Sequence, residues 1–77
     1  MSNYLLIVDN SLPSLTARNW AKKSSKEVEV VSAEDFNIDL SVNKPPIFIK
    51  RTFYGLIQGV VEGFKKDKYE RLMSNND

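Results

Sequence analysis

The stretch Tyr4–Val8 is an unbroken apolar run that stops at Asp9, and helix-start signals follow within a few residues. A short run that is apolar at every position is typical of a strand covered on both faces, so residues 3–8 are predicted to form such a strand. Pro13 suits the first turn of a helix, where its missing N–H leaves no hydrogen bond unmade. A strand followed at once by a helix is therefore the first constraint on the fold.

The predicted helix runs from Pro13 to Lys23. Small and apolar side chains recur on one of its faces at the spacing of helical turns, and the basic side chains lie off that face. The inward positions are Ala17, Trp20, Ala21 and Ser24. Lys22 and Lys23 fall in the last turn, where the helix dipole favours cations. Val28–Val31 is then a second strand, and a strand, helix and strand in this order form a right-handed parallel βαβ unit.

Residues 32–44 give a weaker signal. Ser32 is suited to cap a helical turn, but farther along polar residues separate the apolar ones in strict alternation, which is typical of an extended segment with one buried side. The apolar residues of this alternation are Phe36, Ile38, Leu40 and Val42. We expect a loop with a single helical turn, ended by the pair Pro45-Pro46.

The C-terminal part of the chain predicts an antiparallel hairpin and a final helix. Ile47–Ile49 and Phe53–Ile57 are apolar runs separated by the polar Lys50–Thr52, which is the pattern of two strands joined by a short turn. Gly59 is expected to end the hairpin, and Val61–Met73 to form the last helix. The inward side chains of that helix are predicted to be Phe64, Tyr69, Leu72 and Met73. The residues after it are expected to fray.

The predicted elements follow the order β-α-β, a connection, and β-β-α. The fold class is therefore α/β, with a four-stranded mixed sheet and helices packed on it, in a single domain spanning residues 1–77. A chain of 77 residues buries only about 60% of its unfolded surface, so its core is thin.

The composition excludes several kinds of site. The chain contains no cysteine and no histidine, and its net charge is +1. Disulfides, cysteine-ligated metals and the most common general base are therefore absent. The charge balance does not favour a membrane surface, and no apolar run approaches the roughly 20 residues of a membrane span. The start of the chain lacks a secretory signal pattern, so we expect a soluble, cytoplasmic protein with no membrane partner.

The element order and several residues resemble the glutaredoxin branch of the thioredoxin family. That family places Cys-x-x-Cys between its first strand and first helix, and here Ser11 and Ser14 stand at that spacing, with Pro13 between them. Pro45 has the place of the family's cis-proline, and Gly59 that of the glycine turn that opens the last helix. The resemblance covers nearly the whole chain and implies a minimal thioredoxin fold.

The resemblance assigns Ser11 and Ser14 to the positions of the catalytic cysteines and implies a binding rim around them. That rim comprises Leu12, Pro13, Lys44, Pro45 and Gly59. Two departures bear on glutathione. The second helix of the family is shortened or absent, and Gln58-Gly59 stands where glutaredoxins usually carry a glycine pair. We therefore expect no cofactor. Binding of glutathione is implied by the resemblance alone.

Serine cannot perform the chemistry of this family. Thiol–disulfide exchange needs a thiolate, which a helix N-terminus stabilises. A serine hydroxyl has no useful anionic form near neutral pH, and no histidine is present to activate it. The chain as written therefore has no thiol redox activity, and whether it is an enzyme stays open.

Three functions remain after this exclusion. The first is a redox-silent module that binds a protein or peptide in a groove between Ser11–Pro13 and Pro45, in the manner of strand addition. The second is a glutaredoxin-like oxidoreductase whose cysteines have been replaced by Ser11 and Ser14. The third is nucleic-acid binding through the basic and aromatic hairpin Lys50–Tyr54, which a net charge of +1 disfavours.

Purely structural interpretations stand beside these functions. Ser11 or Ser14 can cap the helix in any protein. Pro45 can be an ordinary trans proline of a turn rather than a cis-proline. Trp20, on the inward helix face, is better explained as a core residue than as a platform for a ligand.

Overall fold

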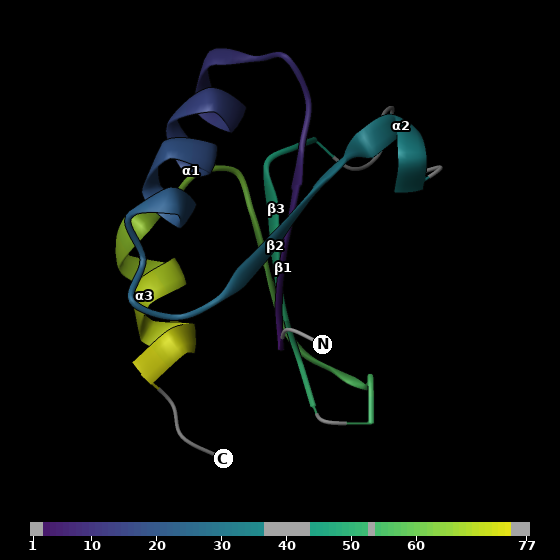
Figure 1. The fold of residues 1–77 in the computed structure, drawn as a ribbon, viewed down its shortest axis with the longest axis vertical. Coiled ribbons are helices and arrows are strands. Elements are labelled where there is room, and N and C mark those ends of the chain that lie inside the picture. The colour runs from purple at the N-terminus through teal and green to yellow at the C-terminus, as the bar shows by residue number, and fades with distance from the viewer. Residues whose placement is uncertain (1–2, 37–43, 53, 75–77) are drawn as a thin grey trace.

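The central strand of the sheet is β1 (Tyr4–Val8), and all of its side chains are buried. The computed structural model describes residues 3–36, 44–52 and 54–74. Within these ranges the other elements follow in chain order (Figure 1). They are α1 (Leu12–Lys22), β2 (Val28–Ser32), α2 (Ala33–Phe36), β3 (Ile47–Arg51), β4 (Ile57–Glu62) and α3 (Lys66–Ser74).

The described strands form one four-stranded sheet in the order β2-β1-β3-β4. β1 pairs in parallel with β2, with Leu6 opposite Val30, and antiparallel with β3, with Leu6 opposite Phe48. β4 adds antiparallel to β3 at the other edge. The predicted α/β fold with a mixed sheet is confirmed, and its β-α-β then β-β-α order is consistent with a minimal thioredoxin fold.

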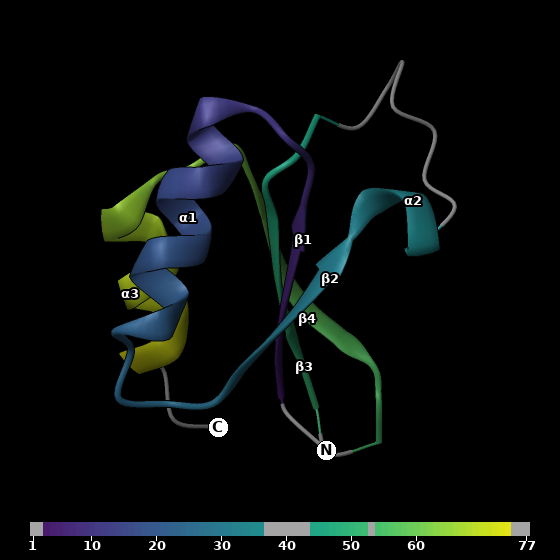
Figure 2. The same cartoon turned by 45° about the horizontal axis from the view of Figure 1, so that its top comes forward.

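α1 and α3 cover one face of the sheet, and α2 lies on the opposite side (Figures 1 and 2). This two-sided cover explains why β1 is apolar at every position. Tyr4, Leu6 and Val8 point to the core under α1 and α3, while Leu5 and Ile7 point to a smaller cluster with Ala33 of α2. The expectation of a strand covered on both faces is confirmed.

An aromatic stack forms the main core. The ring of Phe48 stacks on that of Tyr69, with centroids 4.6 Å apart, and on that of Tyr4, with centroids 5.8 Å apart. Trp20 meets both Phe48 and Tyr69 edge-on, at 5.5 and 5.2 Å. Trp20 therefore packs against the core from α1, and Tyr69 fixes α3 on the sheet. Of the side chains predicted inward on the last helix, Tyr69 and Met73 are buried, and Phe64 and Leu72 pack against the same cluster while partly exposed.

The last two elements begin later than predicted. β4 covers Ile57–Glu62, not Phe53–Ile57, and α3 begins at Lys66, not Val61. The β-branched Val60 and Val61 pair with β3, whose strand continues through Arg51 instead of turning at Lys50.

Glycines mark the real turns of this region. The hairpin turns after Thr52, whose N–H donates to the Leu56 carbonyl at 2.7 Å, and Gly55 there has φ +87°. Gly63, with φ +75°, follows β4, and its backbone conformation favours glycine.

Gly59 was predicted to end the hairpin. This prediction is wrong, because Gly59 lies inside β4. A Cβ atom at this position would be 2.7 Å from a terminal methyl of Leu72 in α3. Its role in the structure is therefore close packing of a helix on a strand, not a change of chain direction.

The remaining predictions on the backbone fare better. α1 begins at Leu12 and ends at Lys22, within one residue of the predicted bounds at each end. The single helical turn expected after β2 is α2, and the Ser32 hydroxyl accepts a hydrogen bond from the Glu34 N–H at 3.3 Å. The alternation predicted over 37–43 and the fraying predicted over 75–77 lie outside the described residues; Ser74, predicted to fray, is the last residue of α3. No helix within the described ranges has the length and apolar character needed to cross a membrane.

Replacement of Phe48 by alanine is expected to lower the free energy of unfolding by about 3–5 kcal/mol. Phe48 is fully buried and contacts three other rings, so the change leaves a cavity in a thin core. Urea unfolding followed by circular dichroism measures the loss. The control is Leu12→Ala, since Leu12 is 78% exposed and its truncation should change stability by less than about 0.5 kcal/mol. Equal effects of the two changes would contradict this core assignment.

Candidate functional site

The residues of the candidate site leave the sheet at one end. The antiparallel register sets Ile7 opposite Ile47, so the chain exits β1 beside the point where it enters β3. The turn into α1 and the prolines before β3 therefore lie at the same end of the molecule, which is the upper end in Figure 2. This arrangement places the Ser11–Ser14 turn and the Pro45–Pro46 segment at the same end of the sheet.

Hydrogen bonds within the turn engage both serines. Ser11 is the N-cap of α1, with an extended backbone, and its hydroxyl oxygen accepts the Ser14 N–H at 3.3 Å. Ser14 is fully buried, and its hydroxyl oxygen accepts the Asp9 N–H at 3.1 Å. The interpretation of Ser11 as a helix cap is therefore confirmed, and Ser14 ties the end of β1 to the first turn of α1.

Asp9 is the charged group of this turn, and sequence reasoning did not select it. Its carboxylate accepts a hydrogen bond from the Ser11 N–H at 3.0 Å and from the Ser11 hydroxyl at 2.5 Å. The hydrogen bond with the Ser11 side chain, followed by that with Ser14, lowers the pKa of Asp9. The carboxylate also lies beside the N-terminus of α1, where the helix dipole favours an anion. A carboxylate with a lowered pKa is a weak general base at neutral pH, so Asp9 does not activate Ser11 as a nucleophile.

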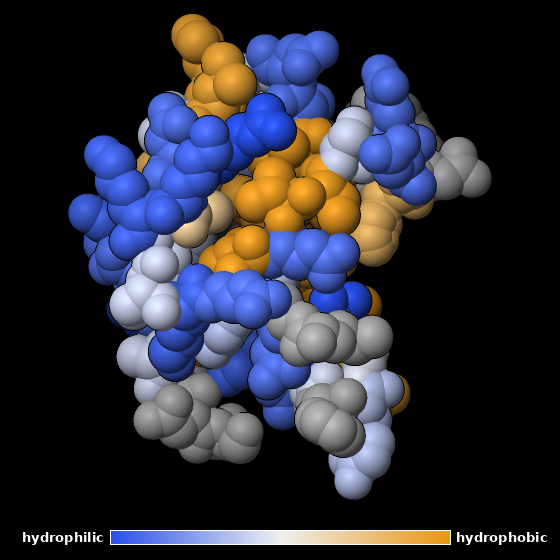
Figure 3. All heavy atoms as spheres, in the orientation of Figure 1, coloured by the Kyte–Doolittle hydropathy of each residue, from blue (hydrophilic) through white to orange (hydrophobic). Residues whose placement is uncertain are grey.

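The rim of the candidate site exposes apolar surface. Leu12 is 78% exposed, Pro13 is exposed beside it, and Leu15 is 43% exposed one turn along. In the space-filling view, hydrophobic atoms project at the end of the molecule where α1 begins (Figure 3). Lys44 is also exposed, and Pro45 is half-buried.

Two of the predicted rim positions need correction. The cis peptide bond joins Pro45 to Pro46, so Pro46 and not Pro45 is the cis residue. Pro46 is fully buried, and its carbonyl accepts the Gly63 N–H at 2.7 Å. Gly59 lies under Leu72 and away from the rim, and Gly63 is the glycine that reaches this end of the sheet. A signal for the end of this strand was present in the sequence. Gly63 stands between a β-branched run and a segment of acidic and basic residues.

A small cavity of about 190 Å³ lies beside the turn, between the end of β1, β2 and α2. Asp9, Arg18 and Glu34 contribute charged groups to its lining. Its volume is below the roughly 300 Å³ at which small-molecule sites usually begin, so a larger ligand would have to lie across the surface. Among the described residues, no three His, Cys, Asp or Glu side chains are grouped so as to hold a metal ion.

The Lys50–Tyr54 hairpin, predicted as an alternative interface for nucleic acid, has its basic residues away from its tip. Lys50 is only 7% exposed, on the strand face that packs under α3, and Arg51 pairs with Glu29 across the sheet at 3.5 Å. Tyr54 is 87% exposed at the turn, and Phe53 lies outside the described residues. Phosphate contact by Lys50 would therefore require it to leave the core.

Comparisons of the chain with protein-family models, with curated proteins and with solved structures found no match. The functional assignment therefore rests on the geometry of the turn and its rim.

The ionised Asp9 carboxylate is expected to stabilise the fold at neutral pH. Because its pKa is lowered in the folded chain, this contribution is present above the unfolded pKa of about 3.9 and is lost as the pH falls through the folded value. Asp9→Asn keeps an oxygen acceptor but removes the charge, and should lower the free energy of unfolding by about 1 kcal/mol at pH 7. Urea unfolding at pH 7 and pH 3 should show the two proteins converging at the lower pH.

The matched control for this measurement is Asp35→Asn, which removes an exposed carboxylate from α2. Its difference from the unmodified chain should change less between the two pH values than that of Asp9→Asn. A constant difference for Asp9→Asn at both pH values would show that its charge has no part in holding the turn.

Proposed function

We propose that this chain is a redox-silent domain of thioredoxin-like fold that binds a segment of another protein at the rim formed by Ser11–Pro13 and Pro45. The observation that carries the proposal is the exposure of Leu12 at a turn whose polar groups are already hydrogen-bonded. Such a turn offers a partner a rigid apolar contact, while its hydroxyls and carboxylate stabilise the turn itself.

The rigidity of the rim supports a binding role. Ser11 caps the helix that presents Leu12, and the buried Ser14 fixes the first turn of that helix to the end of β1. Pro46, fully buried, anchors the other side of the rim through the Gly63 N–H. A surface that is already ordered loses little conformational entropy on binding, so an exposed leucine on it contributes most of its burial free energy to affinity.

The extended form of the partner is taken from the resemblance. In proteins of the thioredoxin family, backbone groups beside the cis-proline pair with an extended peptide, in the manner of strand addition. Here the half-buried Pro45 borders the same end of the sheet as Leu12, and because proline has no N–H it can offer such a segment only its carbonyl. The partner is therefore proposed to be an extended segment with an apolar side chain that packs on Leu12 and Pro13.

The alternative, an oxidoreductase with replaced cysteines, is less well supported by the electrostatics of the turn. A thiol at position 11 would lie beside the Asp9 carboxylate, whose oxygen is 2.5 Å from the present hydroxyl. A neighbouring negative charge disfavours a second anion and raises a thiol pKa. The N-terminus of α1 lowers a thiol pKa, because the positive end of the helix dipole stabilises an anion. The Asp9 carboxylate already offsets part of that positive potential.

The rim proposal predicts a specific loss of binding when Leu12 is changed. Peptides would be selected from a random phage-displayed library on the immobilised chain, and the Kd of one of them measured by fluorescence anisotropy. Leu12→Asp should weaken binding by about 10- to 100-fold, because burial of a leucine contributes about 1.5–3 kcal/mol.

The matched control for that measurement is Leu56→Asp, since Leu56 is a similarly exposed leucine, at 68%, beside the hairpin turn. It should change the Kd less than about twofold. Amide chemical shifts of the bound chain should change at residues 11–15 and 44–46. Weaker binding by Leu56→Asp with Leu12→Asp unaffected would place the interface at the other end of the sheet.

The electrostatic comparison predicts that a cysteine introduced at position 11 is a poor thiolate. The pH dependence of alkylation of Ser11→Cys should give a thiol pKa at or above the ordinary value of about 8.5. Adding Asp9→Asn should lower it. A pKa below about 7.5 for Ser11→Cys, together with catalytic reduction of a disulfide by Ser11→Cys/Ser14→Cys, would favour the oxidoreductase and contradict the redox-silent assignment.

A further inference from the structure

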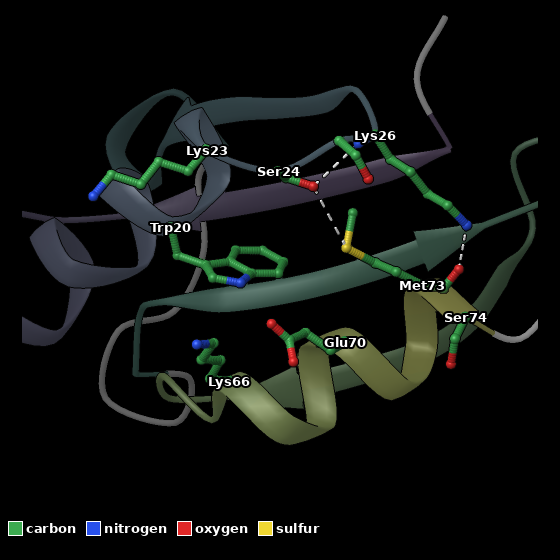
Figure 4. Close-up of a pocket in the computed structure, with 9 residues that line it drawn as sticks. Trp20, Lys23, Ser24, Lys26, Lys66, Glu70, Met73 and Ser74 are labelled. Carbon is green, nitrogen blue, oxygen red and sulfur yellow. Dashed lines mark hydrogen bonds between the residues drawn. The ribbon is translucent and has the colours of Figure 1, made fainter.

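A larger cavity lies at the opposite end of α1, in a groove between that end and α3. The cavity in this groove measures about 540 Å³, within the range of roughly 300–1,000 Å³ typical of small-molecule sites. Its lining includes Trp20, Lys23, Lys26, Lys66, Glu70 and Met73 (Figure 4). Since α1 has 11 residues, its two ends are about 16 Å apart, so this groove is separate from the rim around Leu12.

The apolar part of the groove is a rigid aromatic surface. Trp20 is half-buried, because one side of its indole meets the rings of Phe48 and Tyr69 edge-on, at 5.5 and 5.2 Å. The rest of the ring opens into the groove, where Met73 lies opposite on α3 (Figure 4). An indole and a thioether together favour a flat aromatic ring, since sulfur and aromatic edges attract one another and rings pack edge-on or offset.

One end of the groove is held in place by hydrogen bonds. The Lys26 ammonium donates to the Met73 carbonyl, which also accepts the Tyr4 hydroxyl at 3.3 Å. The same ammonium lies 5.7 Å from the centre of the Tyr4 ring. The Ser24 hydroxyl is 3.8 Å from the Met73 sulfur. Lys26 therefore closes this end of the groove and contributes a fixed positive charge to it.

Ammonium groups outnumber carboxylates in the lining, while the C-terminal ends of α1 and α3 act in the opposite direction. Three lysines, Lys23, Lys26 and Lys66, stand against one carboxylate, Glu70. Within the described ranges one salt bridge forms, between Arg51 and Glu29, and neither residue lines the groove. Lys23 and Lys66 therefore form no salt bridge with a described carboxylate. Lys66 and Glu70 face Trp20 across the groove from α3, while Lys23 extends from its rim (Figure 4). A bound anion would be drawn to Lys66 and repelled by Glu70.

We propose that this groove binds a small planar anion, an aromatic ring bearing a carboxylate or phosphate. The ring packs on Trp20 beside Met73, and the acidic group lies near Lys66, with Lys23 free to turn toward it. The neutral part of such a ligand matches the apolar floor, and its charge matches the excess of ammonium groups. This proposal does not depend on the function proposed for the rim around Leu12, so either proposal can be disproved without affecting the other.

The test follows the indole N–H resonance of Trp20, the single tryptophan of the chain, during titrations with three ligands of one shape. 2-Naphthoate should shift that resonance saturably at millimolar concentrations. 2-Naphthylmethanol, which lacks the charge, and 2-naphthylmethylamine, which reverses it, should bind at least about threefold more weakly. Equal shifts by all three ligands, or no saturable shift by naphthoate, would overturn the proposal.

Charge variants give effects of opposite sign for the same ligand. Lys66→Ala should weaken naphthoate binding about two- to fivefold, and Glu70→Gln should strengthen it by a similar factor, as expected for exposed charges. Lys68→Ala is the matched control, because Lys68 is an exposed lysine of α3 outside the groove lining, and it should leave the Kd unchanged. An amide spectrum of each variant checks the fold. Lys66→Ala and Lys68→Ala with the same Kd would show that the groove does not select an anion.

Discussion

The burial of β1 on both faces is the constraint on which the rest of the structure depends. A chain of 77 residues without cysteine has little other means of joining its parts. β1 lies between β2 and β3, and its alternate side chains enter two separate apolar clusters. On one side Phe48 and Tyr69 complete an aromatic stack that fixes α3, and on the other Ala33 brings α2 onto the sheet. Both the rim and the groove are held in place by elements that pack on this strand.

The N-terminal half was predictable because its signals are local. An apolar run that stops at Asp9, with Pro13 just beyond it, determines a strand and a helix start without knowledge of the remaining chain. The C-terminal half was not, because Val60 and Val61 fit both the end of a strand and the start of an apolar helix face. Only their pairing with β3 decides between these, and that pairing depends on contacts distant in sequence. The same ambiguity made Gly59 seem a turn, when Gly63 has the positive φ.

The local structure of the candidate site was predicted only in part. Ser11 was predicted as a helix cap, and it is one, but its hydrogen-bond partner Asp9 was not predicted. A search for residues at the Cys-x-x-Cys spacing does not consider Asp9. A carboxylate next to a helix N-terminus is evident only when the turn closes. The error over Pro45 has a similar origin, since two successive prolines carry the same bias toward cis, and sequence alone does not choose between them.

The two proposed sites differ in the charge that they offer, and this difference limits what each can bind. At the start of α1 the rim combines the exposed Leu12 with one carboxylate, Asp9, and one exposed ammonium, Lys44, so a segment that docks there gains mainly from apolar contact. At the end of α1 the groove combines an indole surface with an excess of ammonium groups, so it gains from an acidic ligand. The net charge of +1 conceals the local excess of ammonium groups at the groove. A small anion therefore has more to gain in the groove than at the rim, and the two proposals assign the domain two chemically distinct ligands.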